Sequence, residues 1–232
     1  AAAAWAPLAA EALQDTVGLT AALQSAGVDP SRYGMGGAKR LAELLAEVAR
    51  GESVLERCAG PAEGSVGGLR RVVEPVFVQL RWRDRVLVEV EQRFRDGRTR
   101  QRNMVLAEKR APSDEDARAT SLRGIAEELD LPSDLPALSE LFQYMNDSYT
   151  CMTESRESPS YPGLQCIYHT HNCVLQLTEA GASYFAGLGL LLDEFETSEP
   201  DKVNLWRWVP LPMAREMRVK GLPDPDTPGQ PR

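Results

Sequence analysis

The sequence predicts an α/β protein with a helical N-terminal extension and a flexible C-terminal tail. Three observations favour this class. Apolar residues alternate along residues 76–80, the turn dipeptide Asp96-Gly97 separates two further β-rich segments, and an amphipathic helical pattern follows at residues 113–131. This order of strands and helix indicates a sheet with helices packed on it.

The N-terminal part of the chain is expected to be helical. Residues 4–26 and 37–50 have the period of helices, most clearly in the leucine-rich second segment, and turn signals lie between them. A glycine-rich stretch at residues 60–68 indicates a linker. We therefore expect three parts: an extension over residues 1–68, a central domain over 69–212 and a tail over 213–232.

The central domain is expected to begin with three strands. Residues 76–80 are apolar on both faces, as in a central strand, and the Asp96-Gly97 turn predicts a hairpin after them. The expected elements are strands at 76–80, 86–91, 98–106, 141–153, 164–177 and 205–209, with a turn at 81–85 and a loop at 154–163. Residues 178–193 are not assigned to an element.

The helix predicted over residues 113–131 contains the candidate site residues. Its apolar face has the i, i+3, i+4, i+7 spacing and is formed by Leu122, Ile125, Ala126 and Leu129. Ser113 is the expected N-cap. Arg123 and Glu127 lie four residues apart and are expected to form an ion pair across one helical turn.

The segment Lys109–Leu131 resembles the signature of the Nudix hydrolases, which reads G, five residues, E, seven residues, R-E-U-x-E-E-x-G-U, with U a bulky aliphatic residue. Without a gap, the matching positions are Glu115, Arg123, Ile125, Glu127, Glu128 and Leu131. Three positions depart from the pattern: Lys109 and Asp130 replace glycines, and Gly124 replaces a glutamate.

The resemblance implies an α/β/α sandwich with a mixed sheet and cleavage of a nucleoside diphosphate linked to another group, with Mg²⁺ or Mn²⁺. It assigns the metal to Glu127 and Glu128, an orienting role to Arg123 and an assisting role to Glu115. Gly124 removes one carboxylate from this group, because positions 124, 127 and 128 share a helix face. The favoured hypothesis is a degenerate binding or structural module, and the alternative is an active hydrolase in which Glu154 or Glu157 replaces the missing carboxylate.

A third hypothesis is a zinc-stabilised interaction protein. The two histidines of the chain lie between two cysteines, in the set Cys166, His169, His171 and Cys173. His-x-His on a strand places both rings on one face, but Cys166 falls on the other face. The favoured interpretation is therefore an ordinary strand with polar outward residues and small buried thiols.

Two further groups of residues have a structural and a functional interpretation. Arginines crowd the hairpin region, at positions 81, 83, 85, 93, 95, 98, 100 and 102. They could meet phosphates of a nucleotide or of RNA, or an acidic partner subunit, but cross-strand ion pairs on a solvated sheet are favoured. Trp82, Trp206 and Trp208 could stack a base, and core packing is favoured for them.

Composition limits the function classes. A net charge of −8 and a pI of about 5.0 argue against general nucleic-acid binding. No apolar run is long enough to span a bilayer, and four cysteines make no disulfide framework. The missing initiator methionine and the richness in Ala, Arg and Gly lead us to expect a mature organellar protein, in a chloroplast or mitochondrion, within a larger protein complex.

Overall fold

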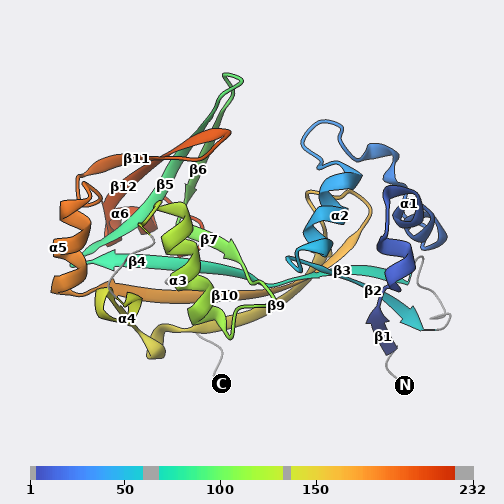
Figure 1. Ribbon diagram of the computed structural model, residues 1–232, viewed down its shortest axis with the longest axis horizontal. Coiled ribbons are helices and arrows are strands. Elements are labelled where there is room, and N and C mark those ends of the chain that lie inside the picture. The colour runs from blue at the N-terminus through green and yellow to red at the C-terminus, as the bar shows by residue number, and fades with distance from the viewer. Residues whose placement is uncertain (1–3, 60–67, 133–136, 223–232) are drawn as a thin grey trace. The chain divides into compact units, whose positions relative to one another are not determined.

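The computed structural model describes residues 4–59, 68–132 and 137–222, and the chain forms two compact units (Figure 1). Unit 1 contains the chain up to Pro75 together with Lys109–Ser113 and Met152–Thr170. Unit 2 contains Val76–Glu108, Asp114–Cys151 and the chain from His171 onward. The division therefore does not follow the single boundary expected between residues 68 and 69, because unit 1 also takes two later segments of the chain.

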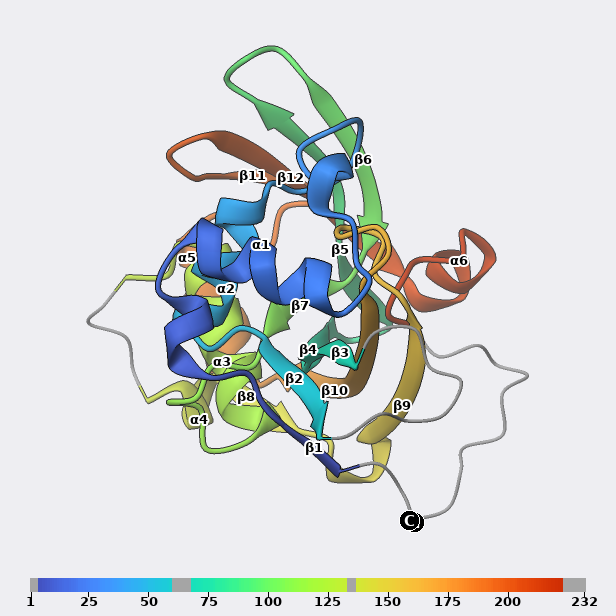
Figure 2. The same cartoon turned by 90° about the vertical axis from the view of Figure 1, so that its right-hand side faces the viewer.

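Unit 1 combines two α-helices with a small sheet. Its elements are β1 (Ala4–Pro7), η1 (Ala10–Leu13), α1 (Thr16–Ser25), η2 (Pro30–Arg32), α2 (Leu41–Ala49), β2 (Val54–Ala59) and β3 (Leu69–Val73). Strands β1, β2 and β3 are antiparallel neighbours, and β3 pairs in parallel with the first residues of β10 (Gln165–Leu177). Figure 2 shows β1 and β2 side by side beneath the helices.

The helical extension expected over residues 1–68 also contains two strands. The helices expected over 4–26 and 37–50 are present in shorter form, but β1 and β2 are strands. Both strands are short and lack a strong period-two pattern, and they are strands because β1 pairs with β2 and β2 with β3. The core of unit 1 contains Leu19, Leu23, Leu44, Leu55 and Tyr161, which are almost fully buried.

Unit 2 is built on a mixed sheet. Its strands are β4 (Pro75–Trp82), β5 (Arg85–Phe94), β6 (Thr99–Met104), β7 (Leu106–Lys109), β8 (Phe142–Tyr144), β11 (Glu194–Ser198), β12 (Lys202–Pro210) and the later part of β10. The order is β10-β4-β5-β12-β11, with β10 parallel to β4 and the other pairs antiparallel. Strands β6, β7 and β8 pair with β5, β4 and β10 respectively.

Helices cover both faces of this sheet. On one face, α3 (Ala117–Glu128) and α5 (Glu179–Gly187) bury Ile125 and Phe185 against a cluster that includes Leu87. On the other face, α6 (Leu211–Glu216) buries Ala214 against Val86 and Val88, because successive residues of β5 point to opposite faces. Unit 2 is therefore a three-layer α/β/α arrangement, and the predicted fold class is confirmed.

Several predicted boundaries differ from the structure. The strand expected over 141–153 is instead a short helix α4 (Leu138–Leu141), β8, a 3₁₀ turn η3 (Asn146–Ser148) and the start of β9 (Thr150–Glu157). Strand β9 also occupies part of the loop expected over 154–163. The unassigned segment 178–193 contains α5, whose glycines weaken the helical pattern.

The C-terminal region also differs from expectation. The strand expected at 205–209 is present as β12, helix α6 follows it, and Ala214 and Val219 inside the predicted 213–232 tail are buried. The proline-rich end, residues 223–232, lies outside the described residues. No helix in the described part of the chain is long and apolar enough to cross a membrane.

Candidate functional site

Helix α3 begins at an aspartate and not at the expected Ser113. The Asp116 carboxylate accepts a hydrogen bond from the Ala119 N–H at 2.8 Å, which satisfies one of the free N–H groups of the first turn. After the helix, Asp130 has a φ of +50°, a left-handed conformation that favours glycine and that aspartate tolerates. The residue that replaces the late glycine of the Nudix signature therefore still makes the turn.

The buried face of α3 includes the residue that departs most from the signature. Ile125 is fully buried, as expected, and Gly124 beside it is buried too. A Cβ at position 124 would lie 3.0 Å from Glu108 Cβ and 3.3 Å from Leu106 Cδ2. Glycine at this position therefore lets α3 pack closely on β7, and a larger side chain would have to displace Glu108.

Arg123 is the centre of an ion-pair network. Its Nε and Nη2 donate to the two carboxylate oxygens of Asp114 at 3.1 and 2.9 Å, and its Nη1 lies 3.0 Å from Glu127 Oε2 and 3.8 Å from Glu108 Oε2. The hydrogen bonds that Arg123 donates to Asp114, together with the charges of Glu108, Asp114 and Glu127, raise the pKa of Arg123 above its usual range. The pair expected between Arg123 and Glu127 is therefore present, and Asp114 holds the other side of the guanidinium.

The two signature glutamates have different environments. The Glu127 side chain is 58% exposed, whereas Glu128 is half-buried. Burial raises the pKa of Glu128 to about 7; the Lys202 charge opposes this rise, and the charges of Glu199, Glu89 and Glu108 add to it. Glu128 is thus a carboxyl group that titrates near neutral pH, a property common at functional sites.

Some residues of this region were not expected from the sequence. Glu89 is 4% exposed, and its Oε2 accepts from Arg102 Nε at 2.9 Å. Glu89 and Glu108 lie on strands β5 and β7, so no local pattern connects them with α3. Glu115 lies on the exposed surface before α3, and Asp114 is the residue before it in the chain. Only the spacing of the signature, which points to Glu115, could have directed attention to Asp114.

The carboxylates are not arranged as a metal site. Among the described residues, no group of three or more His, Cys, Asp or Glu side chains is placed to hold a metal ion. Glu127 and Glu128 therefore form no such group with a third ligand among the residues that the structure describes.

The same finding gives no support to a zinc site. Cys166 and Cys173 are fully buried, and Cys173 Sγ lies 3.1 Å from the Tyr144 hydroxyl. His169 Nδ1 contacts the Thr153 hydroxyl at 2.9 Å, and His171 Nδ1 contacts the Tyr149 hydroxyl at 2.8 Å. These neighbours agree with an ordinary strand that carries buried thiols.

Four of the eight arginines in the hairpin region form ion pairs with carboxylates of the described residues, and Arg81 bonds to a glutamine. Ion pairs or hydrogen bonds join Arg85 to Asp193, Arg93 to Glu91 and Glu196, Arg98 to Asp96, Arg102 to Glu89 and Arg81 to Gln79. The tryptophans are core residues: Trp206 and Trp208 are 1% and 4% exposed, and each indole N–H has an acceptor. Core packing is therefore present for these two tryptophans, whereas for the arginines the contacts show only a partly ion-paired surface.

Comparison with known proteins identifies a similar solved structure, described as the crystal structure of an ADP compounds hydrolase. The identity is 16% and the TM-score 0.35, over 75% of this chain and 78% of that chain. No protein-family model matches the sequence, and no curated protein matches it.

The environment of Glu128 has a consequence for stability. Its raised pKa means that the folded state binds more protons than the unfolded state between pH 4.5 and about 7, so this group lowers stability as pH rises through that window. Glu128→Gln should therefore stabilise the protein by about 2 kcal/mol at pH 8 and have little effect at pH 4.5. Urea unfolding at both pH values measures this difference.

The neighbouring glutamate provides the control. Glu127→Gln removes an exposed charge and one surface ion pair, so it should change stability by less than about 1 kcal/mol at either pH. An equal effect of Glu128→Gln at pH 4.5 and pH 8 would contradict a proton-linked origin.

Proposed function

We propose that unit 2 is a Nudix-like domain with a degenerate signature, which serves as a binding or structural module and does not hydrolyse diphosphates. The observation that carries this proposal is the packing of Gly124. The family's third carboxylate would stand at this position, but a side chain there would meet Glu108 and Leu106. At position 124, where catalysis would need a metal ligand, the signature helix therefore packs against Glu108 and Leu106.

The charges around α3 support the same proposal. Arg123 forms ion pairs with three carboxylates. Two of them, on Glu108 and Asp114, lie before α3 in the chain, so these pairs link the helix to that segment. Without a metal ion, the exposed carboxylate of Glu127 and the partly ionised carboxyl group of Glu128 would disfavour the phosphates of a nucleotide. A partner protein with a basic surface fits this acidic helix end better, and we place the module within a larger, organellar assembly.

An active hydrolase is the second candidate, and one observation favours it. A carboxyl group with a pKa of about 7, such as Glu128, suits proton transfer at neutral pH. In that case Glu108, whose Cβ stands beside position 124, would be the residue to replace the missing glutamate. Mg²⁺ or Mn²⁺ would then supply the polarising charge on the diphosphate.

The deciding experiment measures phosphate and nucleotide release by the purified chain from a panel of nucleoside-diphosphate derivatives, with Mg²⁺ and with Mn²⁺. We expect rates within about twofold of those of the double variant Glu127→Gln/Glu128→Gln, since Gly124 takes the place of one carboxylate of the family's site. Calorimetric titration with both ions is expected to give equal weak heats for the two proteins. Turnover or metal binding that the double variant loses would establish the hydrolase instead.

The variant Gly124→Glu extends this test. A degenerate site that lacked only one carboxylate would gain activity, but the crowding by Glu108 leads us to expect a less stable protein that stays inactive. The melting temperature of the variant, measured beside its activity, separates a misfolded protein from a folded and inactive one.

A further inference from the structure

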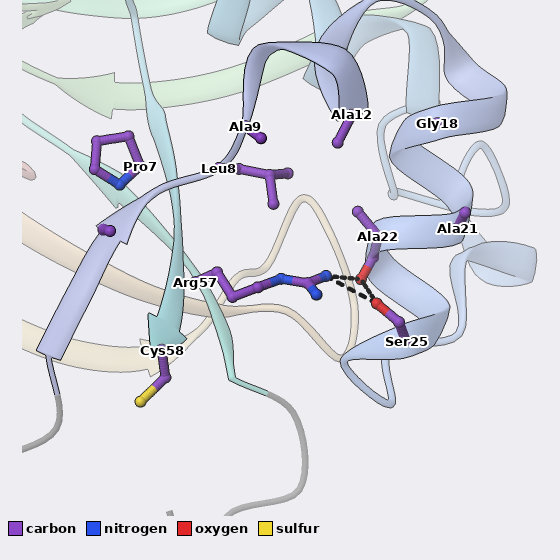
Figure 3. A pocket seen from close by; sticks show the side chains of 11 residues that line it. Pro7, Leu8, Ala9, Ala12, Gly18, Ala21, Ala22, Ser25, Arg57 and Cys58 are labelled. Carbon is purple, nitrogen blue, oxygen red and sulfur yellow. Dashed lines mark hydrogen bonds between the residues drawn. The ribbon is translucent and has the colours of Figure 1, made fainter. Parts of the chain in front are cut away.

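Unit 1 contains a cavity that has no part in the α3 site. Its volume is about 570 Å³, which lies within the range of small-molecule sites. Figure 3 shows it between the end of β1, the turn η1 and helix α1, with β2 below. Most of the lining side chains are small and apolar, among them Ala6, Pro7, Leu8, Ala12, Ala21 and Ala22.

Local sequence explains why the wall is open. Helix α1 presents Gly18 and Ala21 toward the cavity, and these residues fill little of it. A Cβ at Gly18 would lie 3.2 Å from the Ala12 carbonyl oxygen, so the glycine also lets η1 approach α1. The packing of η1 on α1 therefore keeps an apolar wall exposed at the surface, and an apolar molecule can bind there.

Arg57 is the charged group of this cavity. Among the described residues that line it there is no carboxylate, and Arg57 carries the only charge. Its Nη2 donates to the Ala22 carbonyl oxygen at 3.1 Å and to the Ser25 hydroxyl at 2.8 Å, as the dashed lines in Figure 3 show. Both bonds go to neutral acceptors, so they orient the guanidinium without neutralising it.

The neighbouring arginines of the same sheet are different. Arg70 pairs with Glu56 at 2.7 Å and lies over the Trp5 ring, and Arg71 pairs with Glu47 at 2.5 Å. Arg57 has no carboxylate partner among the residues that the structure describes. Because its Nη2 makes both of the bonds to neutral acceptors, Nε and Nη1 remain as donors, and each of them can give a carboxylate one charge-assisted hydrogen bond.

From this combination we infer that the cavity binds a small amphiphile with one carboxylate, whose apolar body lies on the alanine-lined wall and whose carboxylate pairs with Arg57. The apolar lining accounts for the body of the ligand, and the unneutralised guanidinium accounts for its charge. The site belongs to unit 1 and is independent of the function proposed for unit 2.

The test uses decanoate and decan-1-ol, which share an apolar chain and differ in charge, at concentrations below micelle formation. Binding to the full chain is measured by calorimetry and by amide chemical-shift changes. Decanoate should bind at least about tenfold more tightly than decanol, because a hydrogen-bonded charge pair contributes that much or more. The shift changes should cluster at residues 6–25 and at Arg57.

Two variants locate the site. Arg57→Gln should weaken decanoate binding about tenfold and leave decanol binding within about twofold. Ala21→Phe, at an exposed position in the cavity wall, should abolish binding of both probes. Val17→Phe is the matched control, since Val17 lies on the same helix, is 74% exposed and does not line the cavity.

Three results would overturn the inference. Equal affinity for decanoate and decanol would remove the role of Arg57, and shift changes elsewhere in the chain would place the ligand in another site. Self-association that Ala21→Phe abolishes, without decanoate binding, would assign the cavity to a second copy of the chain. Thermal melting of each variant distinguishes lost binding from lost folding.

Discussion

Replacing Glu47 by glutamine should lower the free energy of unfolding by about 3–5 kcal/mol, since it leaves a buried arginine without its partner. Glu47 is 2% exposed in the core of unit 1 and contacts Arg71, Lys39 and Lys109 at 2.5, 2.5 and 3.1 Å. The Arg71 side chain is itself only 6% exposed. Guanidinium chloride unfolding of the wild-type protein and the variant measures the loss.

The same group makes stability depend on pH. Burial alone would raise the pKa of Glu47, but the hydrogen bond from Lys39 and the charges of Arg71 and Lys109 outweigh it and lower the pKa from 4.5 to about 2. The contribution is therefore fully present above pH 4.5 and is lost as the pH falls toward 2. The advantage of wild type over Glu47→Gln should shrink across this window.

A glutamate on the same helix provides the control. Glu43 of α2 is more exposed, and its carboxylate accepts from the Arg40 N–H as part of a capping box, a role that glutamine also performs. Glu43→Gln should cost less than about 1 kcal/mol. Equal losses from the two variants would show that burial of the network is not the cause.

Gly181→Ala should destabilise unit 2 by about 3 kcal/mol, because the added methyl group would overlap a backbone carbonyl. Gly181 lies in the first turn of α5, where the Thr178 hydroxyl caps its N–H. A Cβ at this position would overlap the Leu141 carbonyl oxygen and lie 2.9 Å from its carbonyl carbon. Backbone atoms cannot rotate away as a side chain can, so α4 and α5 would have to separate. Thermal and urea unfolding measure the effect.

The same helix offers a matched glycine. A Cβ at Gly187, the last residue of α5, meets no atom within 4 Å. Gly187→Ala should therefore be neutral or stabilise the protein by up to about 1 kcal/mol through helix propensity. If Gly181→Ala were as mild as Gly187→Ala, the close contact between Gly181 and Leu141 would not be present in solution.

Local patterns predicted the elements whose signal is contained in consecutive residues. The alternation of Val76, Val78 and Leu80 corresponds to β4, the Asp96-Gly97 turn joins β5 to β6, and the stripe that includes Ile125 is the buried face of α3. These patterns are reliable because one buried face requires a fixed spacing along the chain. Helix α5 was not assigned because its glycines weaken the local pattern, and one of them, Gly181, is required by a contact with Leu141, far away in the sequence.

The candidate site was predicted only in part. The sequence placed Arg123 and Glu127 one helical turn apart, and they form the expected ion pair. It did not place Glu108 or Glu89 near α3, because strands β5 and β7 are brought there by the folding of the sheet. The number of ligands around α3, on which catalysis depends, therefore could not be counted from the sequence.

The sequence by itself determined the α/β class, the central strands, the signature helix and the residue that departs from the signature at position 124. The tertiary structure alone decided what that departure does, since the burial of Gly124 against Glu108 arises from the packing of α3 on β7. The cavity at Arg57 and the buried ion-pair network of Glu47 also arise only in the tertiary structure. The physical reason is that secondary structure follows from the spacing of neighbouring residues, whereas these sites depend on contacts between residues far apart in the chain.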